Sequence, residues 1–267
     1  MRSASFPVQF IKDFVLTIRN HQQAMHFIAR HKLWKGLMRY GWVSKLVLFV
    51  GLIAGLKLFL ILNHWWNSAT GDSIAHALQS LGSLFKEVAF EGYEFFFVGG
   101  FKYLILIIME ILLFHITRRT IEIKTGKSQD LTIDAFIKAE IRMIKTAISA
   151  FILESIGTVA IGVVLGVIGY DFLQPFFVLL LQCYFLGFVV IDNYNELYSM
   201  SIRESERVTR EFFGVAIAIG LVTYLLLLLP IVGAVLAPFV GAVTATLTMH
   251  SLQDEFQKFV PLQHEMV

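Results

Sequence analysis

The stretch LLLLLPIVGAVLAPFVGAVTATL, residues 225–247, contains no charged side chain but carries two prolines, Pro230 and Pro238. Proline removes a backbone hydrogen-bond donor and clashes with the preceding helical turn. The two prolines are therefore predicted to bracket a short helix break, in which Gly233 adopts conformations that other residues resist. A half-helix starting there would point its free N–H groups at an anion. The alternative is a tight turn between two short spans.

The composition indicates an integral membrane protein. The 267 residues are 57% hydrophobic and 16% charged, and the mean hydropathy is +0.70. Lys and Arg exceed Asp and Glu by only 22 to 20, so the net charge predicts no nucleic-acid partner. A single cysteine, Cys183, excludes an intramolecular disulfide and a multi-cysteine metal site. Because no nucleophile elbow, phosphate loop or dinucleotide fingerprint is present, neither an enzyme nor a cofactor is predicted.

Six apolar segments approach the roughly 20 residues that a helix needs to cross a bilayer. They are 43–62, 95–116, 146–169, 172–191, 212–229 and 231–249. The predicted fold is therefore an all-α integral membrane protein, with two long transmembrane helices plus two helical hairpins. One hairpin turns at the sequence GYDFLQP, residues 169–175, and the other turns at Pro230. The short final segments either cross the bilayer fully or penetrate it partly.

Basic residues cluster before the first predicted span and after the second, whereas the intervening segment 63–94 is acidic. By the positive-inside rule, both termini are predicted to be cytoplasmic. Residues 1–42 are predicted to form a basic, interfacial helical region, and 43–267 a single helical membrane domain. Further amphipathic helices are expected at 74–88, on the outer surface, and at 131–144, leading into the third span.

Ionisable residues within the predicted spans are the first candidates for an anion pathway. At 1.5 Å per residue, Lys57 and Lys102 lie at one depth in the outer half, while Glu110 and Glu154 lie in the inner half. The two lysines would draw an anion inward, and Gln182 would replace its hydration deeper down. The alternatives are lysines that snorkel to the interface or that pair with the glutamates. An enzyme using both glutamates as acid and base is a third hypothesis.

The basic run ARHKLWKGLMRYGW, residues 29–42, supplies the remaining candidates, Arg30, Lys32, Lys35 and Arg39. These side chains are predicted to bind anionic lipid headgroups and to set the topology. The alternative is that they bind a soluble anion at the cytoplasmic mouth of a pathway.

Residues 189–247, VVIDNYNELYSMSIRESERVTREFFGVAIAIGLVTYLLLLLPIVGAVLAPFVGAVTATL, resemble the CysZ and etoposide-induced-protein membrane family. The matching positions are Asp192, Tyr194, Asn195, Glu196, Arg207, Arg210, Gly214, Gly220, Pro230, Gly233, Pro238, Ala245 and Thr246. The segment HKLWKGLMRY is similar to the family's basic turn before its first span. The family's proline after that turn is replaced here by Tyr40, Gly41 and Trp42.

The resemblance implies an oligomeric, all-helical fold with two long transmembrane helices and hairpins that penetrate partly. For the bacterial branch it also implies sulfate uptake for cysteine synthesis, whereas the eukaryotic branch acts otherwise at the endoplasmic reticulum. The predicted function is a bacterial inner-membrane permease or channel-like protein for a small oxyanion such as sulfate. Membrane lipids and further copies of the chain are its expected partners. The alternative is a non-transporting membrane protein that organises lipids or partner proteins.

Overall fold

The computed structural model describes residues 6–34, 102, 106–107, 110–126, 133–229 and 232–259. Its elements are α1 (Phe6–His31), α5 (Glu110–Thr125), α6 (Ile133–Ile168), η3 (Asp171–Leu173), α7 (Gln174–Glu196), α8 (Ile202–Glu211), α9 (Phe213–Leu227), α10 (Val232–Ser251) and α11 (Gln253–Phe256). Every element in this part of the chain is helical, which confirms the predicted all-α class. The predicted span 43–62 and the predicted helix 74–88 lie outside the described residues.

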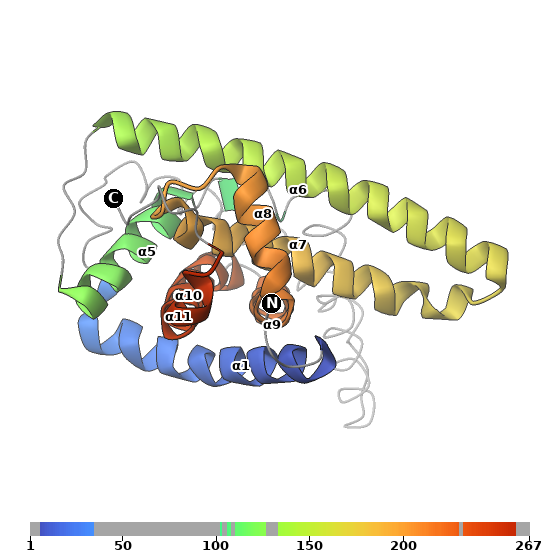
Figure 1. Ribbon diagram of the computed structural model, residues 1–267, viewed down its shortest axis with the longest axis horizontal. Helices are drawn as coiled ribbons and strands as arrows, with labels where there is room; N and C mark the ends of the chain where they lie inside the picture. The colour runs from blue at the N-terminus through green and yellow to red at the C-terminus, as the bar shows by residue number, and fades with distance from the viewer. Residues whose placement is uncertain are drawn as a thin grey trace, which may run out of the picture.

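The helices α6 and α7 form an antiparallel hairpin whose turn lies far from the other labelled helices (Figure 1). Their segments Ile141–Ile168 and Asp171–Glu196 are long and apolar enough to cross a membrane. Within 151–168, only Glu154 and Leu165 are buried, so the outer part of α6 presents an apolar surface suited to acyl chains. These features are those of a multi-pass membrane protein, and they confirm the hairpin predicted from the third and fourth apolar segments.

A glycine ends α6 and allows the hairpin to turn. Gly169 has a φ of +74°, in the left-handed region that glycine adopts without a side-chain clash. The next amide, of Tyr170, donates a hydrogen bond of 2.9 Å to the carbonyl oxygen of Leu165, which caps the end of the helix. After the short helix η3, Pro175 occupies the first turn of α7, where its missing N–H costs no helical hydrogen bond.

The core forms where the second half of α7 meets α9, α10 and α1. Every residue from Gln182 to Asn195 is buried. Two glycines bring α7 and α9 into backbone contact: a Cβ on Gly187 would lie 2.0 Å from the carbonyl oxygen of Ala216, and one on Gly220 would lie 1.7 Å from that of Cys183. Small residues thus permit a helix approach that any larger side chain would prevent.

The helix α1 confirms the helix predicted near the N-terminus. Its buried side chains include Asp13, Thr17, Asn20 and His21, whereas apolar side chains such as Ile18 remain exposed. Part of this polar face is bonded inside the protein, because Asn20 donates a hydrogen bond of 2.9 Å to the hydroxyl of Thr248 on α10. The predicted location of this helix at a membrane surface stays a prediction.

We expect His21 to make the stability of the protein depend on pH. Burial lowers the pKa of His21, and a hydrogen bond of 2.9 Å between Nδ1 and the carbonyl oxygen of Thr17 offsets this only in part. The unfolded chain therefore binds a proton first, so stability is lost as the pH falls below the ordinary histidine value of about 6.5. Unfolding followed by tryptophan fluorescence between pH 7.5 and 5 measures this loss, and a His21→Gln variant should reduce the dependence. An unchanged pH dependence in that variant would contradict the assignment.

The sequence predicted a helix break between Pro230 and Pro238, and this prediction is wrong at Pro238. The helix α10 runs without interruption from Val232 to Ser251 and contains the buried Pro238. Its start follows closely on α9, because the Gly233 amide donates a hydrogen bond of 2.9 Å to the carbonyl oxygen of Leu229. The alternative of a tight turn between two short spans stays a prediction. Pro230 itself lies outside the described residues.

Candidate functional site

A cavity of about 610 Å³ lies where α5, the first part of α6, the end of α7 and the start of α8 meet. We call it the basic cavity. Its lining residues are Phe114, Arg118, Lys138, Ile141, Arg142, Lys145, Glu196, Leu197, Ser199, Ser201 and Ile202. Four of these side chains are cationic and one is a carboxylate, so the cavity carries an excess of positive charge.

Three of the cations come from one face of α6. Lys138, Arg142 and Lys145 are spaced by four and three residues, which places them in a row along the helix. Both lysines are exposed, so their ammonium groups remain available to solvent and to a ligand. The row overlaps the start of the apolar segment Ile141–Ile168, so the cations stand at the boundary of the membrane-length part of the helix.

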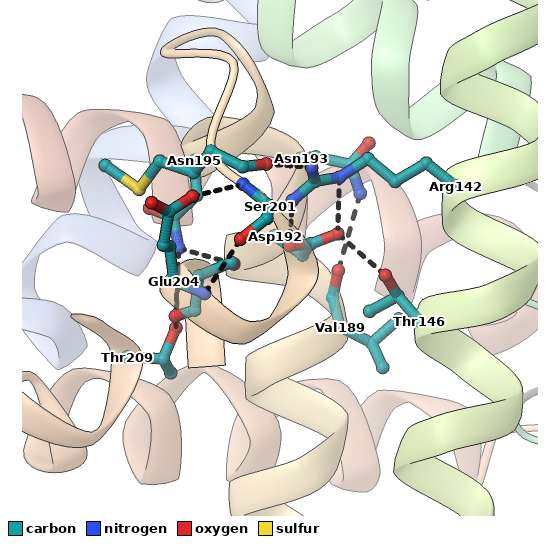
Figure 2. Close-up of polar contacts among 11 residues, drawn as sticks. Arg142, Thr146, Val189, Asp192, Asn193, Asn195, Ser201, Glu204 and Thr209 are labelled. Carbon is teal, nitrogen blue, oxygen red and sulfur yellow. Dashed lines mark hydrogen bonds and ion pairs between the residues drawn. The ribbon is translucent and has the colours of Figure 1, made fainter. Parts of the chain in front are cut away.

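Arg142 is held by a buried carboxylate rather than being open to a ligand. Its Nη2 and Nε donate to the two oxygens of Asp192 on α7, at 2.7 and 3.2 Å, and Nη1 donates to the carbonyl oxygen of Met200. The Thr146 hydroxyl donates a further bond of 3.0 Å to Asp192 (Figure 2). A bidentate arginine–carboxylate pair fixes both groups in one geometry. Arg142 therefore ties α6 to the end of α7 and to the turn that follows.

The turn after α7 is fixed at its other end by the start of α8. Ser201 is the N-cap of α8: its hydroxyl accepts from the amide of Glu204, and the Glu204 carboxylate accepts from the amide of Ser201 at 2.7 Å. This reciprocal arrangement is a capping box. The Asn195 side-chain amide, near the end of α7, donates to the Ser205 hydroxyl at 2.9 Å. Ser199 and Ser201 are thus held at the rim of the basic cavity.

Arg118 reaches the cavity from α5. Its guanidinium lies 5.5 Å from the ring centre of Phe114, one turn earlier on the same helix, which is a cation–π contact. Burial lowers the pKa of Arg118, while the carboxylates of Glu122 and Glu196 act in the opposite direction. The group stays charged at neutral pH, since arginine titrates far above that range. A partly desolvated guanidinium in such a site favours an anionic ligand.

The candidates of the N-terminal basic run lie apart from this cavity. Arg30 and Lys32 are exposed at the end of α1, and neither lines the cavity. Lys35 and Arg39 lie outside the described residues, as does Lys57.

Lys102 is buried and pairs with Glu154 on α6, with its Nζ 2.5 Å from the carboxylate oxygen. This is the pairing alternative of the sequence prediction. The contact brings the two charged groups together, whereas the membrane depths assigned to Lys102 and Glu154 stay predictions.

Gln182 and Gly233 do not join the cavity either. Gln182 is buried in α7 and is not among the cavity residues. The amide of Gly233 is already used within the turn, and a Cβ there would lie 1.8 Å from the carbonyl oxygen of Leu226. Gly233 therefore serves close packing, and its amide is bonded within the protein, while its place on an anion pathway stays a prediction.

The sequence did not predict the cavity, although it contains the cations that line it. In the sequence, Arg118, Lys138, Arg142 and Lys145 belong to the basic cluster after the second predicted span, and Lys138 and Arg142 also belong to the amphipathic helix expected at 131–144. The spacing of the last three along one face of a helix was the available signal. The sequence does not predict the opposite wall of the cavity. Glu196 and the two serines lie opposite α6 only because the α6–α7 hairpin folds back on itself.

The arrangement is suited to binding an anion without chemical change. Lysine ammonium groups and serine hydroxyls supply the donors that sulfate or phosphate oxygens accept. Within the described residues no cluster of His, Cys, Asp and Glu has the geometry to hold a metal ion.

Comparison with known proteins gives a family. No curated protein and no solved structure shows significant similarity to the chain. The family model described as sulfate transporter CysZ/etoposide-induced protein 2.4 matches residues 21–238, which is more than half of the sequence. This range contains every residue of the basic cavity as well as the motif around Asp192. The chain therefore belongs to the sulfate transporter CysZ/etoposide-induced protein 2.4 family.

Proposed function

We propose that this protein is a permease or channel-like protein that moves a small oxyanion, sulfate, across the bacterial inner membrane. Family membership supports a sulfate-transporter-like role at the level of the family. We further propose that both termini are cytoplasmic and that the working form is a homo-oligomer. We propose passage along a protein-lined route rather than transport coupled to ATP hydrolysis, because the sequence contains no phosphate-loop motif.

The basic cavity is the observation that carries this proposal. Ile141 begins the membrane-length segment of α6, and Glu196 ends that of the antiparallel α7, so the cavity between them stands at one membrane boundary. Cations at such a boundary raise the local concentration of an anion and offer donors that replace part of its hydration. Since basic residues favour the cytoplasmic side, this is the cytoplasmic end of the route.

A separate observation, the size of the basic cavity, supports a second candidate function. At roughly 30 Å³ per water molecule, the cavity of about 610 Å³ is much larger than one sulfate ion requires. Exposed apolar side chains, Ile144 and Ile148, continue from the cavity along α6. A cationic cavity beside an apolar surface at the membrane boundary also suits the phosphate of an anionic lipid. In that case the protein organises lipids and does not transport.

Uptake of radiolabelled sulfate into liposomes that contain the purified protein tests the proposal. We expect the double variant Lys138→Gln, Lys145→Gln to raise the half-saturating sulfate concentration by about tenfold or more, because hydrogen bonds to charged groups contribute roughly 1.5–3 kcal/mol each. Both side chains are exposed, so the variant should fold normally. A matched double variant, Lys12→Gln, Arg19→Gln, removes two exposed charges from α1 and should leave the uptake unchanged.

Two results would count against transport of sulfate through this cavity. The first is an absence of uptake by folded, inserted wild-type protein. The second is equal loss in the two double variants, which would indicate a general effect of surface charge. Mass spectrometry of co-purified lipid separates the second candidate: anionic lipid that is retained by the wild type and lost from the Lys138, Lys145 variant would favour the lipid-organising role.

A further inference from the structure

The C-terminal part of the described chain is attached to the core by one fully buried side chain. Among residues 251–259, Phe256 alone is buried, and the others are half-buried or exposed. Its ring centre lies 5.0 Å from that of Tyr198, 5.3 Å from that of Tyr194 and 6.2 Å from that of Phe212. The two tyrosines meet the Phe256 ring edge to face, which is a favoured geometry for aromatic pairs.

The two tyrosines belong to the segment that forms one wall of the basic cavity. They stand on either side of Glu196 and Leu197, which both line the cavity. Their hydroxyl oxygens are 3.2 Å apart, so one hydroxyl donates to the other across the end of α7. Any movement of this aromatic pair therefore moves the two cavity residues between them.

Phe212 lies at the other end of the same segment. It separates α8 from α9, which meet at an angle of 98°. The N-cap of α8, Ser201, also lines the cavity. By packing against both tyrosines and Phe212, Phe256 connects the end of α7 to the bend after α8. The intervening residues 197–211 are thus held at both ends by one ring from a distant part of the sequence.

We propose that Phe256 is a positioning residue for the basic cavity: from α11 it holds the 194–212 segment so that Glu196, Ser199 and Ser201 face the cations of α6. This inference rests on the proposed function only where it is tested by sulfate uptake. Phe256 does not line the cavity, so its effect on an anion passes through the wall segment.

The test compares Phe256→Ala, Phe256→Leu and Phe259→Ala with the wild type. Phe259 is the matched control, because it is half-buried on the same segment and its ring packs on Phe212 at 6.0 Å. We expect Phe256→Ala to raise the half-saturating sulfate concentration about tenfold, which corresponds to 1.4 kcal/mol, with little change in maximal uptake. Phe256→Leu keeps an apolar group in the core but loses the ring contacts, so its loss of affinity and its faster exchange at 197–205 should be smaller than those of Phe256→Ala but still present. Phe259→Ala should leave the affinity unchanged.

Hydrogen–deuterium exchange in detergent supplies a readout that is independent of sulfate. Amides of residues 197–205 should exchange faster in Phe256→Ala, and those of the α7–α9 core should not. Unchanged exchange in 197–205 overturns the proposal whether or not the protein transports. Absence of uptake by the wild type refutes the proposed function alone. If Phe256→Ala does not fold, Phe256→Leu carries the same comparison, and its failure to accelerate exchange at 197–205 relative to Phe259→Ala is then the contradicting result.

Discussion

Replacing Gly220 with alanine is expected to destabilise the protein by about 3 kcal/mol or more, beyond the usual range for adding one methyl group to a core. The added Cβ would lie 1.7 Å from the carbonyl oxygen of Cys183, and real Cβ contacts are essentially never shorter than 3.0 Å. The obstacle is backbone, so no side-chain rotation relieves it. The helices α7 and α9 must separate, which opens the centre of the core. Thermal or denaturant unfolding in detergent measures the loss of stability.

The glycine effect has an internal control. A Cβ on Gly157 of α6 would lie 2.8 Å from Cδ2 of Leu181, which is the end of a flexible side chain. Gly157→Ala should therefore cost little, although it also lies at a helix contact. Gly187→Ala should behave like Gly220→Ala, because its Cβ would lie 2.0 Å from the carbonyl oxygen of Ala216. Equal stability of Gly220→Ala and Gly157→Ala would show that the α7–α9 contact is looser than described.

Replacing Glu154 with leucine should destabilise the protein by about 3–5 kcal/mol, because it leaves the buried ammonium group of Lys102 without its carboxylate. Lys102 has no exposed surface, and its Nζ lies 2.5 Å from the Glu154 oxygen. Removing the carboxylate partner of a charge in such a position costs more than the loss of an ordinary hydrogen bond. Unfolding in detergent at one fixed pH again provides the measurement.

A double variant separates the cost of the unpaired charge from the contribution of the pair itself. Lys102→Met combined with Glu154→Leu should recover most of the stability, since an apolar pair of similar volume is often as stable as a buried ion pair. Arg210→Gln should have little effect, because Arg210 pairs with Glu206 on the exposed face of α8. If the double variant is no more stable than Glu154→Leu alone, the penalty does not come from the unpaired lysine.

Periodicity and length predicted the α6–α7 hairpin well. The segments 146–169 and 172–191 are apolar over membrane length, and the intervening GYDFLQP contains both the glycine that ends one helix and the proline that begins the next. These are local properties, so each is visible in a short window of sequence. The prediction failed at Pro238 because proline weakens a helix only locally, and burial of α10 against its neighbours outweighs that loss.

The candidate site was harder to predict because its two walls come from separate elements. The lysines on α6 are recognisable as a basic row, but Glu196 and Ser201 face them only after the hairpin has folded back. The same holds for Arg142: its charge is visible in the sequence, whereas its engagement by Asp192 depends on a contact between residues fifty positions apart. From the sequence alone, Arg142 would be predicted to bind the anion directly.

By itself, the sequence determined that the chain is an apolar, all-helical membrane protein of one family, with the turn of the α6–α7 hairpin between Gly169 and Pro175. These features follow from composition, helical periodicity and a motif, all of which act over short stretches of chain. Only the tertiary structure decided which cations share a cavity, that Lys102 is neutralised by Glu154, and that Phe256 packs against the cavity wall. These contacts join residues far apart in the sequence, and their free energy exists only when the helices pack together.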